Sequence, residues 1–135
     1  MENETIGVIV ALAGTIIALS AIIWQIIENK KIAHYTLFAE YTKRYEEIAL
    51  QLPEKLDDTT ILDENEKRYL RVYFDLCSEE YFLNTKELLF KDVWKEWEEG
   101  MKFAFQNKAV FDYWQERKSF YIHFSKFVDE LLEKN

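Results

Sequence analysis

Residues 5–27 read TIGVIVALAGTIIALSAIIWQII, a run of 23 residues without an ionisable side chain. As an α-helix this segment is about 35 Å long, which is enough to cross the hydrocarbon core of a bilayer. It follows MENE rather than a basic start, and it is longer than the apolar part of a cleaved signal peptide. A small domain also has too little surface to bury a helix that is apolar all round. The sequence therefore predicts a retained transmembrane helix, which with its flanks occupies residues 1–29.

The flanking charges predict how this helix is oriented, because Lys and Arg concentrate on the cytoplasmic side of a span. No basic residue precedes the segment, whereas Lys30, Lys31, Lys43 and Arg44 follow it. We therefore expect the N-terminus outside the cell and residues 30–135 in the cytoplasm. The single cysteine, Cys77, suits a reducing compartment, and we expect it to be a small core residue rather than a nucleophile.

One face of the predicted span carries small or polar residues at alternating spacings of four and three. Helices in lipid associate by close backbone contact, which small side chains permit, and by occasional polar hydrogen bonds across the interface. The seven-residue repeat predicts left-handed packing in a homo-oligomer. The alternative is that Gly and Ala are simply common in transmembrane helices. The interface would consist of Gly7, Ala11, Gly14, Ala18, Ala21 and Gln25.

The remainder of the chain predicts an all-α domain over residues 30–135. With 3 Gly and 1 Pro among 135 residues, the chain lacks the turn signals of an all-β fold and the bias of a disordered chain. Apolar residues recur at helical spacing in four segments, about 30–52, 66–83, 91–107 and 108–133. Pro53 should end the first segment, and Asp63 with Glu66 should cap the second. One apolar stripe on each helix, with short connections between them, predicts an antiparallel bundle.

Candidate chemistry in the sequence is sparse. There is no Gly-rich phosphate loop, HExxH or CxxC, and His34 and His123 are the two histidines, so we expect no metal and no cofactor. Residues 28–135 hold 17 basic and 23 acidic side chains, which argues against nucleic-acid binding. Neighbouring acidic residues diverge by about 100° on a helix, so we expect them to be solvated rather than to converge on a metal. These pairs are Asp57–Asp58, Asp63–Glu64, Glu79–Glu80 and Glu98–Glu99.

One arrangement resembles a catalytic motif. Residues 117–123 read RKSFYIH, and an Arg and a His at this spacing resemble the R-x4-6-H motif of HEPN ribonucleases. In that family two protomers join these residues to position a phosphodiester and to transfer protons, so the resemblance makes Arg117 and His123 candidate catalytic residues. On a regular helix they lie about 120° apart, and they would share a site only if the helix began or bent between them.

A structural role is the alternative for both residues. Arg117 falls in the apolar series that includes Trp114 and Tyr121, so it would be partly buried and would need a carboxylate partner. We expect that partner to be Asp75 or Glu80 on the second of the four predicted helices, because a guanidinium pairs well with a carboxylate. His123 would then be a packed or interface residue.

An N-terminal span followed by a small HEPN-like bundle is similar to the membrane accessory protein of type VI-B CRISPR systems. The resemblance implies an oligomeric pore in the bacterial inner membrane that assists antiviral defence, with the HEPN-like domain used for assembly. Its partners would be further copies of itself and the lipid bilayer. Two other functions fit the same residues: a monomeric anchor that presents a protein-binding bundle to a cytosolic partner, and a membrane-tethered HEPN ribonuclease.

Overall fold

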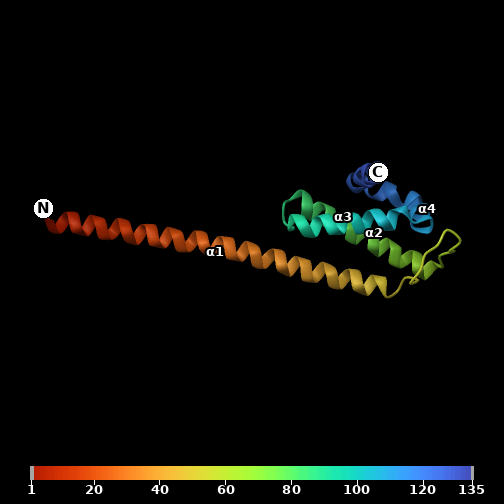
Figure 1. Cartoon of the computed structure of the whole chain (residues 1–135), viewed down its shortest axis with the longest axis horizontal. Coiled ribbons are helices and arrows are strands. Elements are labelled where there is room, and N and C mark those ends of the chain that lie inside the picture. Colours follow the sequence, from red (N-terminus) through yellow and green to blue (C-terminus); the bar gives the residue numbers. More distant parts are fainter. Residues whose placement is uncertain (1, 135) are drawn as a thin grey trace. The chain divides into compact units, whose positions relative to one another are not determined.

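A computed structural model describes residues 2–134, which form five α-helices and one 3-10 turn (Figure 1). No β-strand occurs among these residues, so the all-α prediction is confirmed. The elements are α1 (Glu2–Ala49), α2 (Glu64–Thr85), α3 (Lys91–Gln106), α4 (Lys108–Arg117), the turn η1 (Lys118–Phe120) and α5 (Ile122–Glu133). The chain divides into two compact units, residues 1–36 and residues 37–135.

The first unit consists of the greater part of α1. Every side chain described from residue 2 to residue 27 is exposed, and no part of the most apolar window of this helix is buried. The helix is long and apolar enough to cross a membrane. The apolar segment continues directly into the helix that was predicted from about residue 30, because α1 contains both. The helix ends at Ala49, a few residues before Pro53.

The second unit is built around packed aromatic rings, one each from α2 to α5. Phe74, Phe105, Trp114 and Phe124 are all buried. The ring centre of Trp114 lies 5.1 Å from that of Phe74, 5.2 Å from that of Phe105 and 5.6 Å from that of Phe124, each in an edge-to-face arrangement. This geometry matches the charge distribution of aromatic rings. The end of α1 adds Tyr41 and Ile48 to the same core. The antiparallel order of the helices stays a prediction.

Local signals set most helix ends where the sequence predicts them. At the start of α2, the Asp63 carboxylate accepts a hydrogen bond from the Glu66 amide at 2.7 Å, and the Glu66 carboxylate accepts one from the Asp63 amide at 2.8 Å. The predicted capping box is therefore confirmed. The α2 helix ends at Thr85, and Glu87 follows with a φ of 56°, in the left-handed region.

The prediction of one continuous helix over residues 108–133 is wrong. Helix α4 ends at Arg117, η1 follows, and Tyr121 adopts a ψ of 61° before α5 begins. The Tyr121 hydroxyl donates to the Asp75 carboxylate on α2 at 2.6 Å, and the Tyr121 ring packs 5.3 Å from Trp114. These contacts with α2 and α4 hold Tyr121 in a conformation that a regular helix does not permit.

Candidate functional site

The six residues of the predicted oligomer interface all lie on α1 in the first unit, and all are exposed. A methyl group added to Gly7 or Gly14 would meet no atom within 4 Å. The backbone at these two positions is therefore open to close approach by another helix, which is the geometry that association in lipid requires.

Hydroxyl groups within the apolar segment are satisfied inside the helix itself. The Thr15 hydroxyl donates to the Ala11 carbonyl at 2.9 Å, and the Ser20 hydroxyl donates to the Ile16 carbonyl at 2.8 Å. A hydrocarbon environment offers no water for such groups, so bonding back to the preceding turn makes both side chains compatible with a span.

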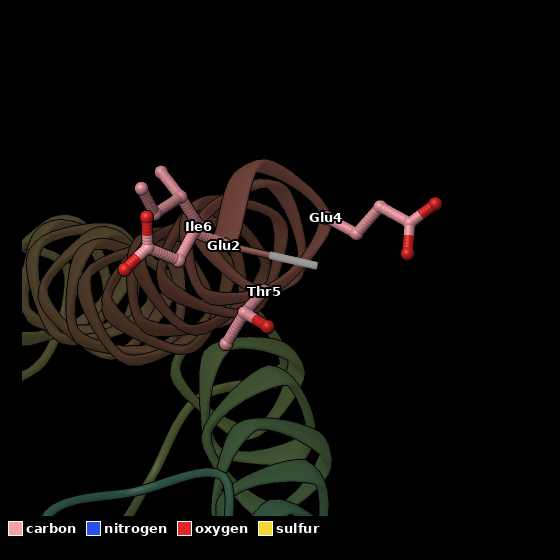
Figure 2. A pocket seen from close by; sticks show the side chains of 4 residues that line it. All are labelled: Glu2, Glu4, Thr5 and Ile6. Atoms are coloured by element: carbon pink, nitrogen blue, oxygen red, sulfur yellow. The ribbon is translucent and has the colours of Figure 1, made fainter.

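A shallow recess at the first turn of α1 does not form a binding site. Figure 2 shows Glu2 and Ile6 on one side of the helix, Glu4 on the opposite side and Thr5 apart from both. Because Glu4 and Thr5 point away from the other two side chains, the four do not converge on a ligand.

The structure places the candidate catalytic residues on either side of a helix break. Arg117 is the last residue of α4, His123 is the second residue of α5, and η1 lies between them. The bend that a shared site would require is therefore present. The guanidinium carbon of Arg117 lies 4.4 Å from the ring centre of Phe120, and His123 is exposed. A catalytic role for the pair stays a prediction.

The predicted ion pair of Arg117 is wrong. Among residues 2–134, no carboxylate lies within 4.0 Å of its guanidinium. Asp75 instead accepts a hydrogen bond from Tyr121, while Glu80 is buried and Arg117 stacks on Phe120. A planar guanidinium stacks well on an aromatic ring, and this contact takes the place of the expected carboxylate.

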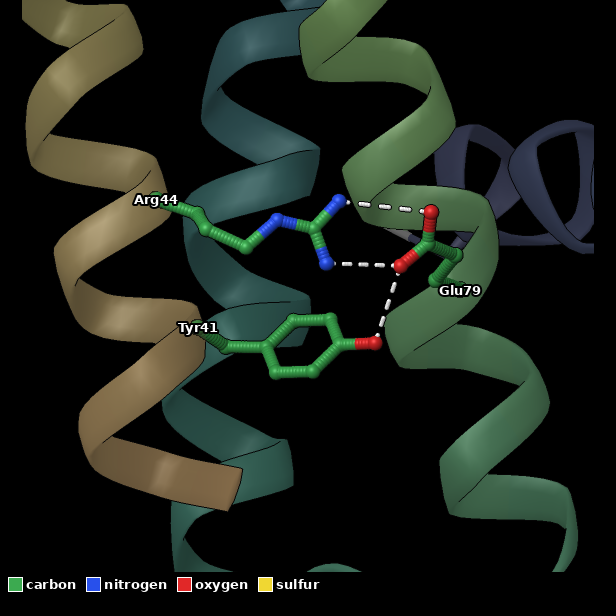
Figure 3. Close-up of polar contacts among 3 residues, drawn as sticks. All are labelled: Tyr41, Arg44 and Glu79. Carbon is green, nitrogen blue, oxygen red and sulfur yellow. Dashed lines mark hydrogen bonds and ion pairs between the residues drawn. The ribbon is translucent and has the colours of Figure 1, made fainter. Parts of the chain in front are cut away.

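A cluster that the sequence analysis missed joins the end of α1 to α2 (Figure 3). The Arg44 guanidinium donates two hydrogen bonds to the Glu79 carboxylate, at 2.7 and 3.3 Å. The Tyr41 hydroxyl donates to the same carboxylate at 2.9 Å, and the Arg44 guanidinium also lies 4.9 Å from the Tyr41 ring centre. Tyr41 and Arg44 lie one helical turn apart, so they reach the same side chain. We call Tyr41, Arg44 and Glu79 the α1–α2 clamp.

The clamp shifts the acidity of its members. The hydrogen bonds from Arg44, and then the one from Tyr41, hold the pKa of the Glu79 carboxyl below its usual value. Burial, with the hydrogen bond to Glu79, raises the pKa of Tyr41 to about 12. Glu79 is exposed, as expected of a solvated acidic face, but its carboxylate is in addition ion-paired with Arg44 across two helices.

The neighbouring residue, Glu80, departs from the expectation of a solvated acidic face. Its side chain is buried, with 6% of the residue exposed, and burial raises the pKa of its carboxyl to about 8. Glu80 lies one turn beyond Cys77 and two beyond Tyr73, whose ring contacts Tyr45 of α1. The helical spacing from Tyr73 and Cys77 is the feature of the sequence that could have indicated the burial of Glu80.

The described residues show no assembled catalytic centre. Cys77 is buried as predicted, and burial raises the pKa of its thiol well above the usual value, so it is not a thiolate nucleophile. Within residues 2–134 no three His, Cys, Asp or Glu side chains come together as a metal site. A recess of about 190 Å³ beside the clamp is lined by Arg44, Glu47, Ile48, Tyr69 and Val72. The clamp joins the end of α1 to α2 through its three polar side chains.

Comparisons with protein-family models, with curated proteins and with solved structures found no match to this chain.

Proposed function

We propose that this chain is a single-pass membrane protein that assembles into a homo-oligomer through residues 5–27. The observation that carries the proposal is the apolar first unit, in which every side chain from residue 2 to residue 27 is exposed. About 20 consecutive apolar residues without a partner in the chain are stable in lipid and costly in water. The basic residues Lys30, Lys31, Lys43 and Arg44 follow the apolar segment and favour a cytoplasmic location for residues 30–135.

The oligomer would form along the stripe from Gly7 to Gln25. Gly7 and Gly14 offer open backbone surface, and the apolar side chains on the other faces suit lipid. The resemblance to the type VI-B accessory protein extends this proposal to a pore, or another membrane-perturbing effector, in the bacterial inner membrane during antiviral defence. A lining of Gly, Ala, Thr15, Ser20 and Gln25 has no ionisable group, so conduction would be weakly selective.

Replacing Gly14 and Ala18 together by Leu tests the assembly. Both side chains fall on the stripe, and added bulk there should separate the helices and lower the particle mass in detergent, as measured by light scattering. The control replaces Ala13 by Leu, which adds bulk off the stripe and should leave the mass unchanged. An unchanged mass in the Gly14 and Ala18 variant would contradict the proposed interface.

The second candidate function is a monomeric anchor that presents the second unit to another protein. The observation that favours it is the exposure of large apolar side chains in that unit, Phe103 being 82% exposed. A monomeric wild-type particle, and unchanged partner capture after the span is replaced by an unrelated apolar helix, would support the anchor. Membrane depolarisation on expression would instead support a pore.

A membrane-tethered ribonuclease makes a third prediction that is simple to check. If Arg117 and His123 are catalytic, His123→Ala should abolish RNA cleavage by the oligomer with little loss of stability, since His123 is exposed. Absence of cleavage by the unmutated oligomer would dismiss this function.

A further inference from the structure

The segment that joins α4 to α5 differs in charge from the rest of the chain. Residues 117–128 read RKSFYIHFSKFV, with three basic side chains, one histidine and no acidic side chain. The whole chain has 25 acidic and 17 basic residues, so this segment is a local basic region in an acidic protein. We call residues 117–128 the elbow.

The turn in the elbow exposes two large apolar side chains. Phe120 and Ile122 are each 69% exposed, while Tyr121 between them is drawn toward Trp114 and Asp75. The helix break causes this arrangement, because fixing Tyr121 against the core directs its two neighbours outward. Exposed apolar side chains beside basic ones are typical of surfaces that bind at a membrane interface.

The basic side chains of the elbow form no close ion pair with the part of the domain that the structure describes. Within residues 2–134, the ion pairs of basic side chains involve Lys31, Lys43, Arg44, Lys67 and Lys108. Arg117, Lys118 and Lys126 have no carboxylate within 4.0 Å in that part of the chain. Asp75 of α2 contacts the elbow, because its carboxylate accepts a hydrogen bond from the Tyr121 hydroxyl. This carboxylate lowers the local positive charge by one.

We propose that the elbow docks on an anionic lipid surface, with Phe120 and Ile122 entering the interface and Arg117, Lys118 and Lys126 facing lipid phosphates. This inference rests on the proposed function, since the span would tether the domain beside the cytoplasmic leaflet, which carries anionic lipids. Tethering raises the effective concentration of the two surfaces, so a few weak contacts are enough for docking. Each basic side chain near such a surface increases binding about fivefold.

The side chains of the elbow fit lipid better than RNA. Single-stranded RNA is bound by bases stacking on open aromatic faces. One face of the Phe120 ring is covered by the Arg117 guanidinium at 4.4 Å, and Ile122 has no ring to stack. The apolar side chains of Phe120 and Ile122 instead suit the hydrocarbon of a bilayer, and the three basic side chains beside them suit the layer of lipid headgroups above it.

The test uses the full chain in lipid nanodiscs, with Ser119→Cys in the elbow labelled by an environment-sensitive fluorophore. Ser119 is exposed and Cys77 is buried, so the label reports on the elbow. With brominated acyl chains, we expect quenching in discs that contain 30% phosphatidylserine and none in purely zwitterionic discs. Salt at 0.5 M should release the elbow, because the attraction is screened.

Matched variants separate docking from other effects. Lys118→Glu with Lys126→Glu should weaken docking at least about 25-fold, from the loss of two charges at about fivefold each. Lys91→Glu with Lys95→Glu changes the net charge equally on exposed positions of α3 and should leave quenching intact. Ile122→Ser should also reduce quenching, whereas Phe103→Ser on α3 should not.

The outcomes distinguish this inference from the function on which it rests. A chain that does not enter discs of any composition would overturn both. A chain that enters the discs but shows equal, low quenching with and without phosphatidylserine would overturn only the docking. A response of the label to an RNA oligonucleotide in zwitterionic discs would also overturn it, by assigning the elbow to RNA.

Discussion

Glu80→Gln is the substitution that most directly tests the interior of the second unit. Glu80 is 6% exposed, and burial raises the pKa of its carboxyl to about 8 from an ordinary value of 4.5. The positive charge of Arg44 opposes this shift, and the negative charge of Glu79 adds to it. On its own helix, the buried Tyr73 and Cys77 are affected by Glu80 in turn, and burial raises the pKa of both.

The sign of the effect follows from the direction of the pKa shift. A group whose pKa is higher in the folded state holds its proton more tightly there, so its contribution to stability is full below pH 4.5. The contribution is lost as the pH rises toward 8. Each pH unit in this window removes about 1.4 kcal/mol, which gives about 5 kcal/mol over the whole window and about 3 kcal/mol by pH 7.

Urea unfolding of the full chain in detergent micelles, followed by tryptophan fluorescence between pH 5 and 9, measures this loss. Trp94, Trp97 and Trp114 report on the second unit, since the core contains or contacts all three. Gln has the shape of the protonated carboxyl and does not titrate, so Glu80→Gln should flatten the decline of the unfolding free energy with pH. The control Glu99→Gln, at an exposed position, should keep it.

Parallel pH curves for the wild type and Glu80→Gln would refute the reasoning. They would mean that the Glu80 carboxyl is ionised in the folded protein at neutral pH, with water or Arg44 offsetting its burial. Glu80→Gln can also lower the unfolding free energy by the same amount at every pH, which reports a change in packing. The reasoning still holds if the decline of the unfolding free energy with pH is removed, because that decline reports the titration of Glu80.

Three further predictions concern the clamp, the capping box and the elbow. A double-mutant cycle on Arg44→Met and Glu79→Gln should give a coupling of about 1 kcal/mol at pH 7, since both side chains are partly exposed. The pKa of Glu79 is lowered, so the coupling should be present above pH 4.5 and lost below it in the same unfolding assay. Asp63→Ala should cost about 1 kcal/mol of unfolding free energy and Asp58→Ala nearly nothing, because Asp63 caps α2. Arg117→Ala should lower the unfolding free energy by about 1 kcal/mol, the value of a partly exposed cation–π contact. A loss of about 3 kcal/mol or more would instead indicate that Arg117 forms a buried ion pair.

Local patterns in the sequence were sufficient to predict the helices and several of their ends. The apolar run over residues 5–27 needs only its own composition to form a helix suited to lipid. Asp63 and Glu66 lie three residues apart, so their reciprocal hydrogen bonds depend on the first turn of α2 alone. Apolar residues at helical spacing also predicted one apolar stripe on the second segment, and Leu70, Phe74 and Cys77 of that segment are buried.

Contacts between distant residues decided the features that the sequence did not predict. Tyr121 breaks the last helix because its hydroxyl reaches Asp75, 46 residues earlier, on another helix. Glu79 and Glu80 look alike in the sequence, yet one is paired with Arg44, 35 residues away, and the other is enclosed in the core. Helical periodicity says which residues share a face but not which helix that face will meet. The sequence by itself therefore determined the helices and the apolar N-terminal segment. Tertiary packing alone decided the elbow, the α1–α2 clamp and the buried carboxyl, because each depends on side chains brought together from separate helices.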